Sequence, residues 1–174
     1  MSANALAFSI EIAVLAPLLG WACASDVRSR RIPNAAVVAI AITGIAASLL
    51  LPPPSPSLLG AAEGMGVGLA VWLPFYALGM LGAGDVKLFA AAGAWLGPRG
   101  ALEGAVLAAL AGGALALGFM LLEGGTAVTL LKLRSAIRAP ESLRDTSVSR
   151  ASRLPYALAM SAGVIGAAYF PGLL

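Results

Sequence analysis

Apolar runs long enough to cross a lipid bilayer follow one another along most of this chain. Three of them, at residues 5–24, 58–81 and 101–122, have about the 20 residues that a transmembrane helix needs. Shorter runs cover 35–51, 86–97 and 155–170. Of the 174 residues, 60% are hydrophobic and 11% are charged, a balance typical of membrane proteins rather than of soluble domains. The pattern predicts an all-α membrane protein, a polytopic bundle of six transmembrane helices forming one domain over residues 1–174.

Glycine, proline and asparagine mark details of these helices. Gly60, Gly64 and Gly68 recur every four residues, which predicts a face on which a neighbouring helix packs closely. Asn34 follows Pro33 and is expected to be the N-cap of the second helix. An uncharged, proline-rich turn at 51–57 separates the second helix from the third.

The run at 86–97 is short for an untilted span, and two interpretations fit it. It is either a re-entrant piece or a short helix that begins below the bilayer surface with Asp85 at its N-cap. We prefer the helix, because Gly93 and Gly97 favour close packing and because the distribution of charge requires a crossing here.

The basic residues predict the orientation, because cytoplasmic loops of membrane proteins are enriched in lysine and arginine. With six spans and an extracytoplasmic N-terminus, only Arg99 lies outside, and both Asp26 and Asp85 lie on the cytoplasmic side. No aromatic residues interleave with the basic ones, so we expect no nucleic-acid partner. The basic residues expected inside are Arg28, Arg30, Arg31, Lys87, Lys132, Arg134, Arg138, Arg144, Arg150 and Arg153.

Two aspartates stand where apolar runs meet these cytoplasmic loops. Asp26 closes the first run, and Asp85 lies in the sequence GAGDVK at 82–87. An ionised side chain at the edge of a bilayer is costly and is a functional-site hypothesis by default. Gly82 and Gly84 remove side-chain bulk before Asp85, so that another backbone can approach the carboxylate. Lys87 either tunes that carboxylate or extends toward the interface.

The composition limits the chemistry open to the chain. It has no histidine and a single cysteine, which excludes an internal disulfide, a Cys/His zinc site and a Ser-His-Asp triad. Two carboxylates in hydrogen-bonding range can share one proton, so that one activates water while the other polarises a scissile carbonyl. Such a pair titrates as a unit, and which aspartate is base and which is acid stays open. This chemistry needs no metal or cofactor.

The remaining acids and the thiol are placed outside the predicted site. Glu63 is the other acid well within a predicted span, near the outer end of the third helix, and is expected to be interfacial or packed against glycine-rich neighbours. The same is expected of Glu11. Cys23 is expected to be a small packing residue. Solvated loop or boundary charges are expected for Glu103, Glu123, Glu141 and Asp145.

Two segments together resemble the paired signatures of type IV prepilin peptidases, membrane aspartic proteases of the GxGD class. Residues 26–34 (DVRSRRIPN) are similar to the family's D-x-x-x-x-x-I-P-N element, which contains Pro33 and Asn34, and residues 82–88 (GAGDVKL) to its G-x-G-D-x-K-L element. Residues 93–97 and 154–156 also resemble family features, although Ala157 stands where glycine is expected.

The resemblance implies that Asp26 and Asp85 are the catalytic pair. It also implies the substrate, the short basic leader of a type IV prepilin, cut at the cytoplasmic face of the bacterial inner membrane. Longer members carry an N-terminal region with paired cysteines that is linked to N-methylation, which is not expected here. The chain resembles the short, peptidase-only members that serve tight-adherence (Flp) pili.

Two other interpretations compete with the prepilin peptidase. A GxGD protease of the presenilin or signal-peptide-peptidase kind would place the first aspartate within a helix after a tyrosine, whereas Asp26 follows Ser25. A small transporter or pilus-assembly platform would use the aspartates for protons or contacts, and it predicts that a single Asp→Asn change is tolerated in cleavage assays.

Overall fold

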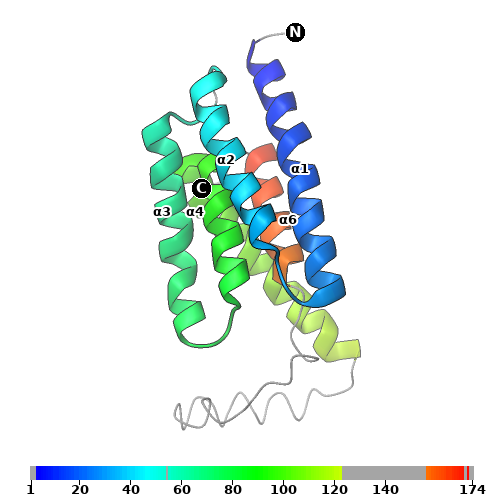
Figure 1. Ribbon diagram of the computed structural model, residues 1–174. Helices are drawn as coiled ribbons and strands as arrows, with labels where there is room; N and C mark the ends of the chain where they lie inside the picture. Colours follow the sequence, from blue (N-terminus) through cyan, green and yellow to red (C-terminus); the bar gives the residue numbers. More distant parts are fainter. Residues whose placement is uncertain (1–2, 54, 123–155, 171, 173–174) are drawn as a thin grey trace.

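The computed structural model describes residues 3–53, 55–122, 156–170 and 172, and within them the regular structure is helical. Figure 1 shows how the helices are arranged. The predicted basic loop at 123–153 lies outside the described residues. The helices are α1 (Ala3–Ser29), α2 (Asn34–Leu50), α3 (Leu58–Ala77), α4 (Ala83–Leu122) and α6 (Tyr156–Tyr169).

Three of these helices contain stretches long and apolar enough to cross a membrane, namely Ser9–Ser29, Leu58–Ala77 and Ala83–Gly118. The helices α2 and α6 are apolar but shorter. Large apolar side chains are exposed on the outer faces of the bundle, among them Leu50 with 80% of its surface accessible and Leu110 with 66%. A surface of this kind suits lipid rather than water. The chain is therefore a multi-pass membrane protein.

Helix α1 continues five residues beyond the end predicted at residue 24, so Asp26 lies inside the helix and not in a loop. No residue from 25 to 29 breaks the helical pattern. The helix ends when Arg30 adopts a left-handed backbone conformation with φ 52°, and its N–H donates to the carbonyl of Asp26 at 2.8 Å. This bond is typical of a left-handed helix cap. The first aspartate is thus carried on the last turn of α1.

Helix α2 begins with Asn34 as its first residue, so the prediction that Asn34 is the N-cap was wrong. Pro33 occupies the cap position in an extended conformation and makes no side-chain cap. Its carbonyl instead accepts the N–H groups of Ala36 at 3.0 Å and Val37 at 3.3 Å. Proline cannot continue a helix toward its N-terminal side, which fixes the boundary one residue earlier than asparagine chemistry suggests.

Helix α3 ends at Ala77, four residues before the predicted end at residue 81. Gly79 has φ 75°, and the N–H of Met80 donates to the carbonyl of Phe75 at 2.9 Å. The N–H of Gly79 donates to Tyr76 at 2.9 Å, which completes a Schellman motif. Glycine at this position stops the helix and turns the chain toward Gly82.

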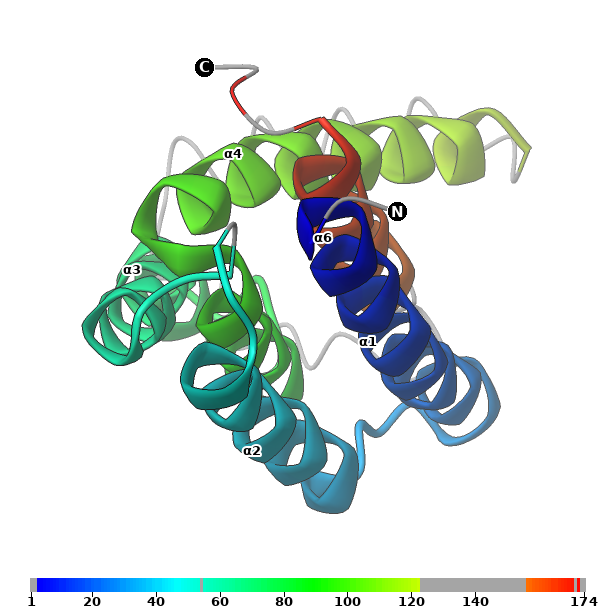
Figure 2. The same ribbon diagram turned by 90° about the horizontal axis from the view of Figure 1, so that it is seen from above.

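Helix α4 is interrupted at Gly97, where φ 68° and ψ 178° are not helical. Only glycine adopts this conformation readily. Pro98 then begins the second part, as proline commonly does in a first helical turn. Figure 2 shows the two parts of α4 meeting at a bend. The predicted helices at 86–97 and 101–122 are therefore both present, joined through Gly97.

The first part of α4 lies at the centre of the bundle and packs against α2 and α3. Gly64 of α3 faces Gly93 of α4, so closely that a Cβ on either glycine would overlap the carbonyl oxygen of the other. Gly68 also faces α4, since a Cβ there would lie 3.0 Å from the carbonyl oxygen of Phe89. The predicted small-residue face is confirmed for these two glycines, whereas Gly60 contacts its own preceding turn.

The contact between α2 and α4 depends on a buried tryptophan. The Nε1–H of Trp95 donates to the carbonyl of Ile40 at 3.0 Å. The indole also fills the space beside Gly44, where an added Cβ would lie 2.9 Å from Cδ1 of Trp95. These contacts fix α2 relative to the first part of α4.

Candidate active site

Asp26 is buried, with 8% of its surface exposed, and its carboxylate is directed at the beginning of α6. Its Oδ2 accepts the backbone N–H of Ala157 at 3.4 Å. Ala157 is the second residue of α6, and the N–H groups in the first turn of a helix have no partner within that helix. The carboxylate of Asp26 therefore occupies the position of a cap for a helix far away in the sequence.

Cys23 lies one turn before Asp26 and faces the same helix. Its Sγ is 3.1 Å from Oγ of Ser161 and 3.4 Å from the carbonyl oxygen of Ala157. Cys23 was predicted to be a packing residue, and the structure gives it a polar contact with α6 as well.

Asp85 is the third residue of α4, so the prediction that it is the N-cap was wrong by three positions. Its Oδ2 accepts the N–H of Gly82 at 3.1 Å. This bond is one half of a capping box, in which an acidic side chain at the third helical position reaches back to the cap residue. A carboxylate in the first helical turn is also favoured by the helix dipole. Gly82, rather than Asp85, is thus the N-cap of α4, which begins at Ala83.

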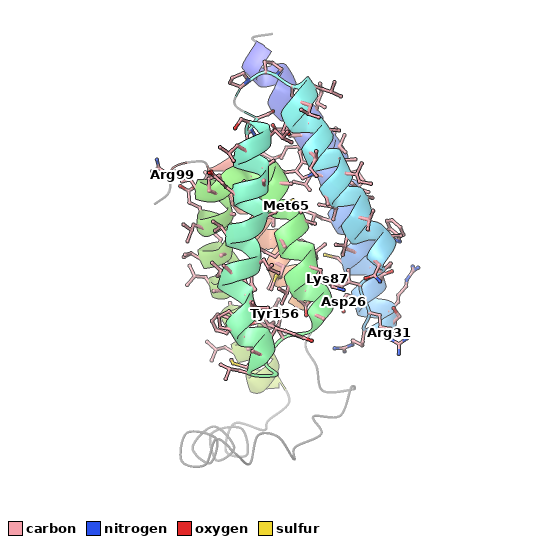
Figure 3. The ribbon with its side chains drawn as sticks, turned by 60° about the vertical axis from the view of Figure 1, so that its left-hand side comes forward. Asp26, Arg31, Met65, Lys87, Arg99 and Tyr156 are labelled. Carbon is pink, nitrogen blue, oxygen red and sulfur yellow. The ribbon has the colours of Figure 1, made fainter. Side chains whose placement is uncertain are left out.

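The two family-like segments lie against each other. A Cβ added to Gly84 would lie 3.2 Å from Cβ of Ile32, so the loop between α1 and α2 packs on the first turn of α4. Gly84 was predicted to admit another backbone, and its open side is faced here by the Ile32 side chain. Figure 3 shows Asp26, Arg31 and Lys87 toward one end of the bundle.

Tyr156 lies toward that same end, while Arg99 lies toward the opposite one (Figure 3). Of the labelled basic residues, Arg31 and Lys87 thus lie toward one end and Arg99 toward the other, while the basic residues at 132–153 lie outside the described residues. The other predicted supporting residues lie at the same two segments: Pro33 is half-buried at the N-cap of α2, and Lys87 and Asn34 have exposed side chains.

The other acids lie away from these segments. Glu103 was predicted to be solvated, but it is buried with 2% of its surface exposed. Its Oε1 forms an ion pair with Nε of Arg99 at 3.4 Å, and its Oε2 accepts the N–H of Gly172 at 3.0 Å. The prediction failed because one of its partners, Gly172, follows α6 and is far along the chain. Glu11 accepts a hydrogen bond from Ser55, and Glu63 is exposed on α3.

Sequence reasoning missed the contribution of α6, because a backbone N–H has no signature in the sequence. The available signal was Tyr156, which lies in the segment 154–156 that resembles a family feature. Its hydroxyl oxygen lies 2.8 Å from where a Cβ of Gly112 would be, so it packs against the second part of α4. Within the described residues, no group of three or more Cys, Asp or Glu side chains is arranged to hold a metal ion.

Comparison with known proteins identifies the family of the chain. The sequence model of the type IV leader peptidase family matches residues 13–117, which is more than half of the chain and includes both Asp26 and Asp85. No curated protein and no solved structure matches the chain. The matched segment ends within the second part of α4, so α6 lies beyond it. On this evidence the chain belongs to the type IV leader peptidase family.

Proposed function

We propose that this leader peptidase is an aspartic endopeptidase that removes the short basic leader of type IV prepilins of the tight-adherence (Flp) kind. Asp26 and Asp85 are the catalytic pair. The observation that carries the proposal is the packing of Ile32 on Gly84, which joins the segment after Asp26 to the segment around Asp85. Family membership supplies the reaction class, cleavage of a prepilin leader.

The reaction follows from the properties of a carboxylate pair. One aspartate accepts a proton from water while the water oxygen attacks the scissile carbonyl carbon. The other, protonated, donates a hydrogen bond and then a proton to the carbonyl oxygen. When the tetrahedral intermediate breaks down, the C–N bond cleaves and the leaving amine receives the proton that the first aspartate took from water. The other aspartate takes a proton from a hydroxyl of the intermediate as the C=O bond re-forms, which restores the pair. Because the two groups titrate together, base and acid are properties of the pair.

We further propose that the active site faces the cytoplasm and that the N-terminus is extracytoplasmic. The six crossings would be α1, α2, α3, the two parts of α4, and α6. Support comes from the charges: Arg28, Arg30, Arg31 and Lys87 belong to the two segments at the Asp26 end, whereas Arg99 lies toward the other end (Figure 3). The leader of a prepilin is cytoplasmic before cleavage, so an active site at this end would reach it.

The activity is tested by co-expressing the chain with an epitope-tagged Flp-type prepilin and following the leader on gels. We expect the prepilin to lose its leader when the chain is present and to keep it with an empty vector. A secretory preprotein with an ordinary signal peptide serves as a matched substrate control and should remain uncut. Full retention of the prepilin leader, with the chain present in the membrane, would contradict the proposal.

A further inference from the structure

The structure assigns to α6 a positioning role in the active site. The backbone N–H of Ala157, in the first turn of α6, positions the Asp26 carboxylate. The contact between Cys23 and Ser161 stabilises this arrangement. The inference rests on the proposed function, because it concerns Asp26 as a catalytic group. It goes beyond the family match, which ends at residue 117 and does not include α6.

Two side chains of α1, those of Cys23 and Asp26, contact the backbone of the same residue of α6, Ala157. Cys23 and Asp26 are three residues apart, so they lie on the same face of α1. The carboxylate of Asp26 receives the N–H of Ala157, and the thiol of Cys23 faces the carbonyl oxygen of the same residue, each at 3.4 Å. Ala157 is completely buried. Both polar groups of one buried residue are thus faced by one face of α1.

Ser161, one helical turn after Ala157, adds a further contact between α1 and α6. It lies four residues after Ala157, has 6% of its surface exposed, and its Oγ is 3.1 Å from the Cys23 thiol. Ser161 is buried and Cys23 is half-buried, so sliding or rotation of α1 against α6 would cost the serine hydroxyl a polar contact in a place with little access to solvent. We infer that this contact keeps α1 and α6 in one register, so that Asp26 meets the N–H of Ala157.

Helix α6 in turn packs on the second part of α4, which Gly97 joins to the first part that carries Asp85. A Cβ on Gly163 would lie 2.6 Å from Cβ of Ala108, so the two helices touch with almost no side-chain bulk between them. The Tyr156 ring packs on Gly112 in the same interface. Asp26 therefore contacts a helix that packs on the second part of α4, and we infer that α6 fixes the position of Asp26 relative to α4.

The contact itself is tested by cross-linking in the full-length, membrane-inserted protein. Cys23 is the single native cysteine, so Ser161→Cys adds one thiol directly opposite it. Mild oxidation with diamide should join the two thiols within one chain, seen as loss of labelling by maleimide-polyethylene glycol and its return after reduction. Ala162→Cys is the matched control: it is the next residue, its side chain is exposed, and it should stay labelled. Retained labelling of Ser161→Cys after oxidation would overturn the inference and leave the proposed function untouched.

The positioning role is tested by kinetics. Cys23→Ala should lower kcat about tenfold and leave KM unchanged, because a misplaced catalytic group costs rate without changing how the leader binds. Cys23→Ser should restore most of kcat, since its hydroxyl can still donate to α6. Oxidised Ser161→Cys should cleave no more slowly than its reduced form, because the register of α1 and α6 stays fixed during turnover. An unchanged kcat in Cys23→Ala, or inhibition that appears on oxidation and disappears on reduction, would contradict the role.

Discussion

Replacing Asp85 with asparagine should reduce leader removal by roughly 10³-fold or more while α4 stays in place. Asparagine has the shape of aspartate, and its Oδ1 can still accept the N–H of Gly82, so the start of the helix keeps its cap. What it loses is the ability to take or give a proton. The measurement is cleavage of a purified prepilin in detergent, with thermal unfolding as the check that the variant is folded.

Glu63→Gln is the matched control for this loss. Glu63 is also an acid on a membrane helix, but it is exposed on α3 and belongs to neither family-like segment. It should cleave at the wild-type rate. An Asp85→Asn protein that cleaves as fast as Glu63→Gln would favour the transporter or assembly-platform interpretation, in which the aspartate contributes protons or contacts but no bond cleavage.

Gly64→Val should cause a large loss of stability. A Cβ at this position would overlap the carbonyl oxygen of Gly93 and would lie 2.9 Å from Cα of Gly97. Both neighbours are backbone, so neither can move aside as a flexible side chain would. Overpacking of this kind costs about 3 kcal/mol or more, and we expect the melting temperature in detergent to fall by roughly 10 °C.

Gly66→Val provides the comparison on the same helix. A Cβ at Gly66 would meet nothing within 4 Å, so the substitution adds the same β-branched side chain to an open face. Its melting temperature should stay within about 2 °C of wild type, because isolated surface changes are usually worth no more than about 0.5 kcal/mol. Equal melting temperatures for the two variants would show that α3 and α4 do not pack through Gly64.

The helices themselves could be predicted from the sequence, because apolar runs of this length have few other stable forms. Their ends were harder to place. Helix α3 stops at Ala77, since Gly79 closes a Schellman motif that the apolar pattern does not reveal. Helix α1 runs on to Ser29, because the boundary of an apolar run is not a signal that ends a helix. The helix ends where Arg30 adopts a left-handed conformation, and arginine has no special preference for that conformation that would mark this end in the sequence.

The site was predictable in part for a related reason. Counting basic residues predicts that Asp26 and Asp85 lie on the same side of the membrane, and the resemblance of the two segments to one family implies their pairing. The N–H of Ala157 could not be predicted, because every residue except proline has that group and only the fold selects one of them. The burial of Glu103 was missed in the same way, since its partner Gly172 follows a helix that packs back across the bundle.

The claim that Asp26 and Asp85 act as one catalytic unit is tested most directly by a double-mutant cycle. The measurement is the single-turnover cleavage rate, with enzyme in excess, of the wild type, Asp26→Asn, Asp85→Asn and the double variant. For a proton-sharing pair, each single change removes nearly all the rate, and the double variant is no slower than the slower single one. A single variant that cleaves at the wild-type rate, or losses that multiply in the double variant, would contradict the claim.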